Sequence, residues 1–64
     1  MRNPKPARHS CLASNRLWRQ EASALRALAG GRHLTEAQRE RLLREAVAAD
    51  RMADAWLAAA IEDG

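Results

Sequence analysis

The chain has 64 residues, a formal net charge of +3 and one cysteine. A chain of this length has room for one small domain with a marginal core, since it buries only about 60% of its unfolded surface. The lone cysteine excludes an intrachain disulfide, and the absence of a secretion signal or long uncharged apolar run argues against export and membrane insertion. We therefore expect a small cytoplasmic protein.

Residues 1–13 are predicted to form a basic, flexible N-terminal arm. Pro4 and Pro6 interrupt this segment, and we find no apolar side chains in it at spacings that would pack together. Its charge comes from Arg2, Lys5 and Arg8.

A first helix is predicted over residues 14–29. Ser10, Ser14 and Asn15 compete as its N-cap, and we place the cap at Ser14. One arc of this helix is apolar: Leu17, Trp18, Ala22, Ala24, Leu25, Leu28 and Ala29. The turn over residues 30–34 begins with two glycines, and Gly30 is expected to take the left-handed position that ends many helices.

A second, longer helix is predicted over residues 35–62. Thr35 and Gln38 have the spacing of a capping box, and the segment contains no Gly or Pro. Its apolar arc consists of Leu42, Ala46, Ala49, Ala53, Trp56, Leu57 and Ala60. Because the connection is short, the fold class is an all-α antiparallel hairpin over residues 14–63. The alternative is a three-helix bundle with a break near Asp50.

The unequal helix lengths predict an exposed apolar end. The second helix would outrun the first by roughly a dozen residues, or ~18 Å, at 1.5 Å per residue. That excess would leave large side chains in water, which usually marks an interface. We therefore predict self-association or partner binding through Trp56, Leu57, Ile61, Leu42, Ala49 and Ala53.

The charge distribution offers a second candidate site. Residues 1–33 carry seven basic and one acidic residue (+6), and residues 34–64 carry four basic and seven acidic residues (−3). A phosphate-binding stripe would consist of Arg2, Lys5, Arg8, Arg16, Arg19 and Arg26. Exposed arginines also keep a helix soluble, and the sequence has no helix-turn-helix spacing or stacking aromatic residues.

The remaining reactive side chains do not predict catalysis. His9 and Cys11 lack the further ligands of a metal site, so Cys11 is expected to be an ordinary small apolar residue, and we expect no cofactor. Glu21 falls among the leucines of the first helix. It is expected either to reach water at the rim of the apolar face or to select an arginine across an interface.

Three functions are compatible with these patterns. The first is a non-enzymatic protein-binding module, such as an adaptor or inhibitor of a larger protein, which is also expected to form a homodimer. The second is a nucleic-acid-binding regulator with the general organisation of small bacterial antitoxins, although no motif is shared with them. The third is a structural subunit of a larger assembly. The abundance of arginine and alanine suggests a bacterial, phage or plasmid origin.

Overall fold

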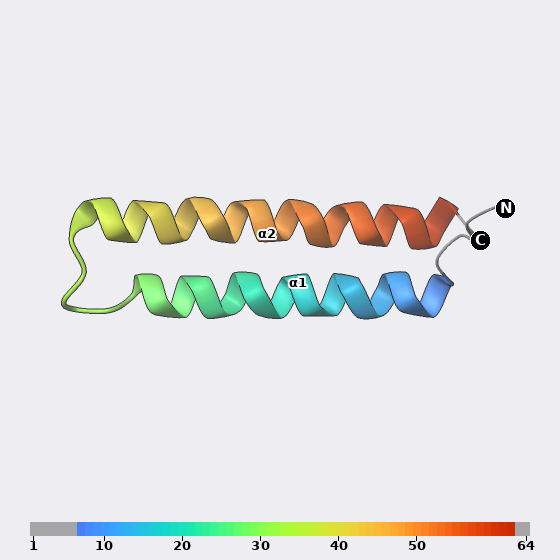
Figure 1. Ribbon diagram of the computed structural model, residues 1–64, viewed down its shortest axis with the longest axis horizontal. Helices are drawn as coiled ribbons and strands as arrows, with labels where there is room; N and C mark the ends of the chain where they lie inside the picture. The colour runs from blue at the N-terminus through green and yellow to red at the C-terminus, as the bar shows by residue number, and fades with distance from the viewer. Residues whose placement is uncertain (1–6, 63–64) are drawn as a thin grey trace, which may run out of the picture.

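The computed structural model describes residues 7–62 and places them in two antiparallel helices joined by a short turn (Figure 1). Helix α1 spans Arg8–Ala29 and helix α2 spans Glu36–Glu62. The described part of the chain contains no strand. The prediction of an all-α hairpin is confirmed. Because α2 passes Asp50 without interruption, the three-helix alternative is wrong.

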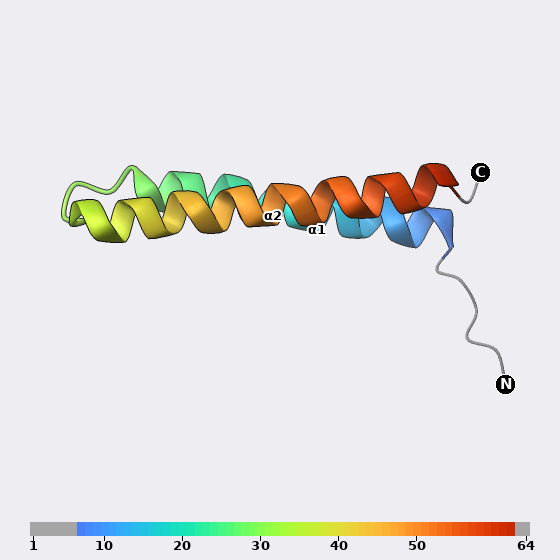
Figure 2. The same cartoon turned by 90° about the horizontal axis from the view of Figure 1, so that it is seen from above.

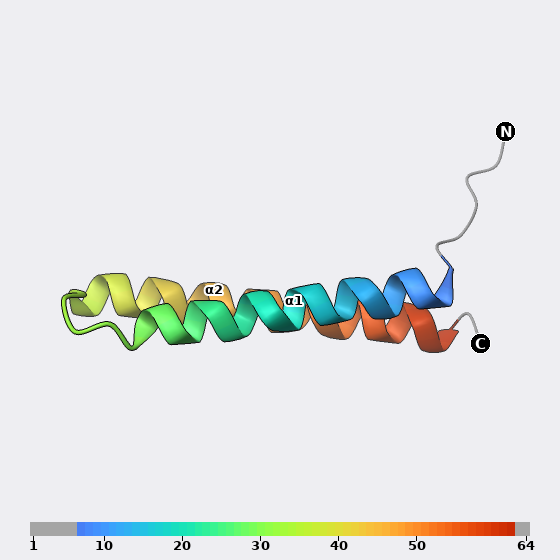
Figure 3. The same ribbon diagram turned by 90° about the horizontal axis from the view of Figure 1, so that it is seen from below.

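Small side chains take the most buried positions in the contact between the helices. Positions alternately three and four residues apart face the other helix, which is the spacing of a coiled coil. All of these seam residues are buried or half-buried: Cys11, Asn15, Trp18, Ala22, Leu25 and Ala29 on α1, and Arg39, Leu42, Ala46, Ala49, Ala53, Trp56 and Ala60 on α2. The fully buried members are Cys11 and the six alanines. Alanine allows two helix backbones to approach closely. The two helices lie alongside each other and cross once, at a shallow angle (Figure 2, Figure 3).

Asn15 is the polar member of this seam. Its side-chain amide Nδ2 donates a hydrogen bond of 2.7 Å to the backbone carbonyl of Ala53. A half-buried amide without a partner would oppose folding, so this bond favours one alignment of α1 along α2. Asn15 is therefore an interhelical contact and does not cap a helix.

Helix α1 begins at Arg8, earlier than the predicted start at Ser14. Ala7 is the N-cap, and its carbonyl accepts hydrogen bonds from the backbone N–H groups of Ser10 (2.9 Å) and Cys11 (3.1 Å). The prediction of an arm over residues 1–13 is therefore wrong for 8–13, and residues 1–6 lie outside the described part. The physical reason is packing, because the seam spacing continues from Asn15 to Cys11 and buries the thiol.

Capping substitutions test this revised start. The Ala7 side chain makes no capping hydrogen bond, and the first turn of α1 contains no acidic residue. Ala7→Asp should therefore stabilise the hairpin by about 1 kcal/mol. In thermal denaturation that gain raises Tm by roughly 4–8 °C for a domain of this size. Ser14→Ala should leave Tm almost unchanged. A loss of stability with Ser14→Ala, and no gain with Ala7→Asp, would instead support a helix that begins at Ser14.

The end of α1 differs from the expected left-handed glycine cap. Gly30 has φ −79° and ψ 0°, which is a right-handed conformation. Its N–H bonds to the carbonyl of Ala27 at 3.2 Å, and the N–H of Gly31 bonds to the carbonyl of Leu28 at 3.0 Å. These tight bonds close the last turn of the helix without a positive φ.

Arg39 of α2 completes this helix end. Its Nε donates to the carbonyl of Ala29 at 2.9 Å, and one terminal nitrogen donates to the carbonyl of Gly31 at 3.1 Å. A guanidinium group at a helix C-terminus satisfies free carbonyls and complements the negative end of the helix dipole. Arg39 therefore ties the beginning of α2 to the end of α1.

The predicted capping box of α2 is confirmed. The backbone N–H of Gln38 donates to Oγ1 of Thr35 at 3.1 Å, and the backbone N–H of Thr35 donates to Oε1 of Gln38 at 2.9 Å. This reciprocal pair satisfies two groups that the helix itself leaves free.

Candidate protein-binding surface

The hairpin has two long flanks, which follow the two sides of the helix seam. On one flank, Arg26 bonds to Asp50, and Arg19 lies 3.9 Å from Oδ1 of Asp50 and 3.5 Å from Oδ1 of Asp54. Exposed ion pairs of this kind contribute only about 0–1 kcal/mol each. They nevertheless identify which sides of α1 and α2 meet, and we call this surface the polar flank.

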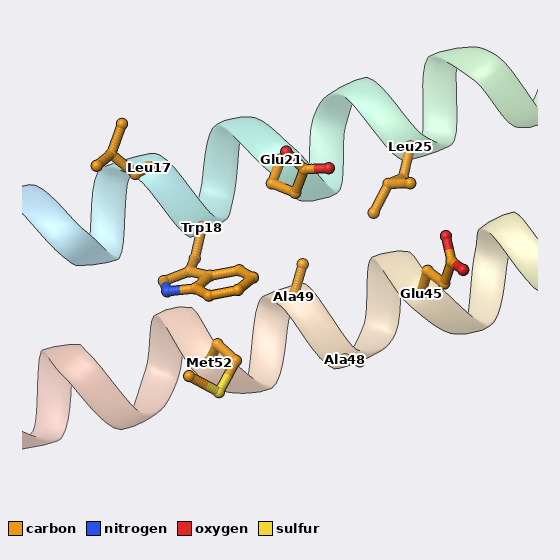
Figure 4. A pocket seen from close by; sticks show the side chains of 8 residues that line it. All are labelled: Leu17, Trp18, Glu21, Leu25, Glu45, Ala48, Ala49 and Met52. Atoms are coloured by element: carbon orange, nitrogen blue, oxygen red, sulfur yellow. The ribbon is translucent and has the colours of Figure 1, made fainter.

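The opposite flank carries an apolar groove between the helices (Figure 4). We define the groove by its lining side chains: Leu17, Trp18, Glu21 and Leu25 of α1, and Glu45, Ala48, Ala49 and Met52 of α2. Its volume is about 710 Å³. That is within the range of pockets, roughly 300–1,000 Å³, that accept several apolar groups.

Large apolar side chains on this flank are exposed. Leu17 retains 65% of its surface, Met52 retains 42%, and Leu28, further along the same side of α1, retains 60%. Leu17, Ala24 and Leu28 each directly precede a seam residue of α1, so they lie on the groove side of this helix, in one row with Glu21. Exposed large apolar side chains gathered on one side of a small protein are typical of a binding interface.

Two carboxylates lie within this apolar surface. Glu21 is exposed, as expected for a carboxylate at the rim, and Glu45 faces the same groove from α2. The ion pairs among residues 7–62 join Arg19 and Arg26 to Asp50 and Asp54, and do not involve Glu21 or Glu45. The groove is therefore mainly apolar, with one carboxylate at each of its two edges.

The predicted overhang of α2 is wrong. Helix α1 contains 22 residues and α2 contains 27, and the first turn of α1 lies beside the last turn of α2 (Figure 1). Of the predicted interface residues, Ala49 and Ala53 are buried between the helices, and Leu42 and Trp56 are half-buried in the seam. Only Leu57 (36%) and Ile61 (67%) are substantially exposed. Partner binding through these last two residues stays a prediction.

The predicted phosphate-binding residues are only partly brought together. Arg8, Arg16, Arg19 and Arg26 belong to α1 and are exposed, whereas Arg2 and Lys5 lie outside the described residues. Asp50 and Asp54 stand beside Arg19 and Arg26, so they reduce the positive potential of the polar flank.

Two further kinds of feature were searched for in the described part of the chain. Within residues 7–62, no three His, Cys, Asp or Glu side chains form a group that could hold a metal ion. Neither α1 nor α2 has an apolar stretch of the length that crosses a bilayer.

Comparisons with protein-family models, curated proteins and solved structures found no match to this chain.

Proposed function

We propose that this protein is a non-enzymatic protein-binding module, which modulates or recruits a larger protein through the apolar groove. The observation that carries this proposal is the distribution of side-chain size. The hairpin uses alanine and one cysteine for its fully buried contacts, while Leu17, Leu28 and Met52 remain exposed beside the groove. A small monomer gains most from burying its largest apolar groups, so their exposure supports a second binding event.

The exposed apolar side chains on the groove side can supply enough free energy for specific binding. Complete burial of a leucine or methionine side chain contributes roughly 1.5–3 kcal/mol. Leu17, Leu28 and Met52 together therefore offer several kcal/mol, before the cost of association is subtracted. The half-buried Trp18 at the groove floor adds an aromatic surface of the type enriched among interface hot spots.

The alternative functions draw less support from the surface. A nucleic-acid regulator would use the polar flank, where Arg19 and Arg26 already face Asp50 and Asp54. A structural subunit would use the same apolar groove as a binding module, and the two functions differ in whether the complex is permanent. The proposal also includes a cytoplasmic location and a bacterial or phage origin for the protein.

The test is affinity capture from lysate of the source organism, with and without nuclease treatment. Wild type is compared with a Leu17→Gln/Met52→Gln variant, which places polar amides beside the groove. The matched control is Leu43→Gln/Val47→Gln, because both residues are exposed apolar side chains of α2 outside the groove. We expect one defined protein to be retained by wild type and the control, and at least about tenfold less by the groove variant.

Two results would contradict the proposal. One is a captured protein that disappears after nuclease treatment, which would indicate a nucleic-acid bridge. The other is equal capture by wild type and the groove variant, while circular dichroism shows that both are folded.

A further inference from the structure

We propose that the groove binds an amphipathic helix of a different protein, and that this helix carries two basic residues which pair with Glu21 and Glu45. This inference rests on the proposed function and specifies the chemistry of the partner. It commits to a basic helix as the occupant, rather than a second copy of this chain.

The position of the two carboxylates is the first argument. Glu21 directly precedes Ala22, and Glu45 directly precedes Ala46, so the two side chains flank the seam from opposite helices. Glu45 lies opposite Leu25, one helical turn along α1 from Glu21 (Figure 4). A helix in the groove would meet both carboxylates with Lys or Arg on opposite edges of its apolar face, for example about five residues apart in sequence and roughly 7.5 Å apart along its axis.

The shape of the groove is the second argument. It runs between two long helices, and its apolar lining extends over Leu17, Leu25 and Met52. A third helix laid along such a groove forms a three-helix arrangement and buries residues at i, i+3, i+4 and i+7. Apolar residues on the same face of the partner helix would contact these side chains, and its basic residues would lie at the edges.

Charge complementarity argues against a second copy in the groove. A symmetric dimer places the same surface on both sides of its interface. Apposing two grooves would therefore gather Glu21 and Glu45 from both copies in an apolar interface, which like-charge repulsion opposes. The described groove lining contains no arginine or lysine that a second copy could offer in exchange. Arg19 and Arg26 lie on the polar flank and face Asp50 and Asp54.

The two kinds of contact have different roles in binding. Burial of the leucine and methionine side chains supplies most of the affinity. The carboxylates select a basic partner, fix its register and accelerate association at low salt. Binding should accordingly weaken as salt increases, without being abolished, because the apolar contacts are not screened.

The test uses two fluorescently labelled helical peptides of about 18 residues with identical apolar faces. One peptide has Lys at two positions on opposite edges of its apolar face, about five residues apart, and the other has Glu at the same positions. Fluorescence anisotropy measures Kd for wild type and for the Glu21→Lys/Glu45→Lys variant. Both carboxylates are exposed, so their reversal leaves the hairpin intact. Circular dichroism of the variant checks this.

We expect a reciprocal exchange of preference. Wild type should bind the Lys peptide at least about tenfold more tightly than the Glu peptide, and the variant should show the opposite order. A Glu36→Lys/Glu40→Lys variant is the matched control, because these exposed carboxylates of α2 lie outside the groove lining and carry the same change of charge. The control should retain the preference of wild type.

Other outcomes would overturn the inference. Equal affinity for both peptides, or the same exchange in the control variant, would show that Glu21 and Glu45 do not select the partner. A monomer–dimer equilibrium in sedimentation that Met52→Gln abolishes would identify a second copy as the occupant. If the peptides show no exchange of preference but partner capture still depends on Leu17 and Met52, the proposed function is retained. Only the basic helix is then excluded as the partner.

Discussion

Ala53→Leu is expected to destabilise the hairpin severely, by about 3 kcal/mol, at the upper end of the usual effect of overpacking. Ala53 has 0% of its surface exposed and lies in the seam, and its carbonyl accepts the hydrogen bond from Asn15. A leucine side chain there must push α1 away, which loosens the neighbouring alanine contacts and lengthens this hydrogen bond. A chain of 64 residues has only a few kcal/mol of stability in total, so much of the population should unfold at 37 °C.

Thermal and urea denaturation followed by circular dichroism measure this effect. The matched control is Ala55→Leu, since Ala55 is exposed on the same helix and receives the same side chain. The control should change stability by no more than about 0.5 kcal/mol. Equal stability of the Ala53 and Ala55 variants would show that α1 does not pack on this face of α2.

Trp56→Ala is expected to lower the stability of the hairpin by about 2 kcal/mol. Truncation of a core tryptophan costs roughly 3–5 kcal/mol, and the smaller value applies because Trp56 is half-buried. Because Trp56 lies in the seam, its indole packs against α1. The sequence alone suggests instead that Trp56 lies on an overhanging end of the second helix, without a packing partner. Helicity should therefore fall at temperatures where wild type remains folded.

Leu57→Ala is the matched comparison for this second substitution. Leu57 is adjacent to Trp56, but it lies outside the seam and is 36% exposed, so its truncation should cost about 1 kcal/mol, less than that of Trp56. Analytical ultracentrifugation and thermal denaturation of both variants distinguish the explanations. A Trp56→Ala protein that keeps full stability but changes its molar mass would show that Trp56 belongs to an intermolecular interface.

Local signals in the sequence were sufficient to predict α2 and the turn. The Thr35–Gln38 capping box and the absence of Gly and Pro locate the second helix, because these determinants lie within a few residues of one another. The start of α1 was not predicted, since Ser14 is a better N-cap by residue type than Ala7. Packing of Cys11 against α2 outweighs that local preference, and it depends on residues far away in the chain.

The groove also could not be predicted from the sequence alone. Helical periodicity groups Leu17, Leu25 and Glu21 on one arc, but it does not give the rotation of α1 relative to α2. That rotation places alanines at the most buried positions of the seam, and places Leu17 and Met52 in the lining of a groove. Glu45 had no distinguishing local signal, and Arg39 contacts Ala29 and Gly31 across the turn.

The most direct test of the account is to locate the binding surface by NMR. Uniformly ¹⁵N-labelled protein is titrated with the Lys peptide, and the backbone amide shifts are followed for every residue from 7 to 62. The account predicts the largest changes at Leu17, Glu21, Glu45 and Met52, with little change at Ser23 and Asp54, which lie away from the groove. Changes centred on Asp50 and Asp54, or at Leu57 and Ile61, or no changes at millimolar peptide, would contradict the assignment of the groove as the protein-binding surface.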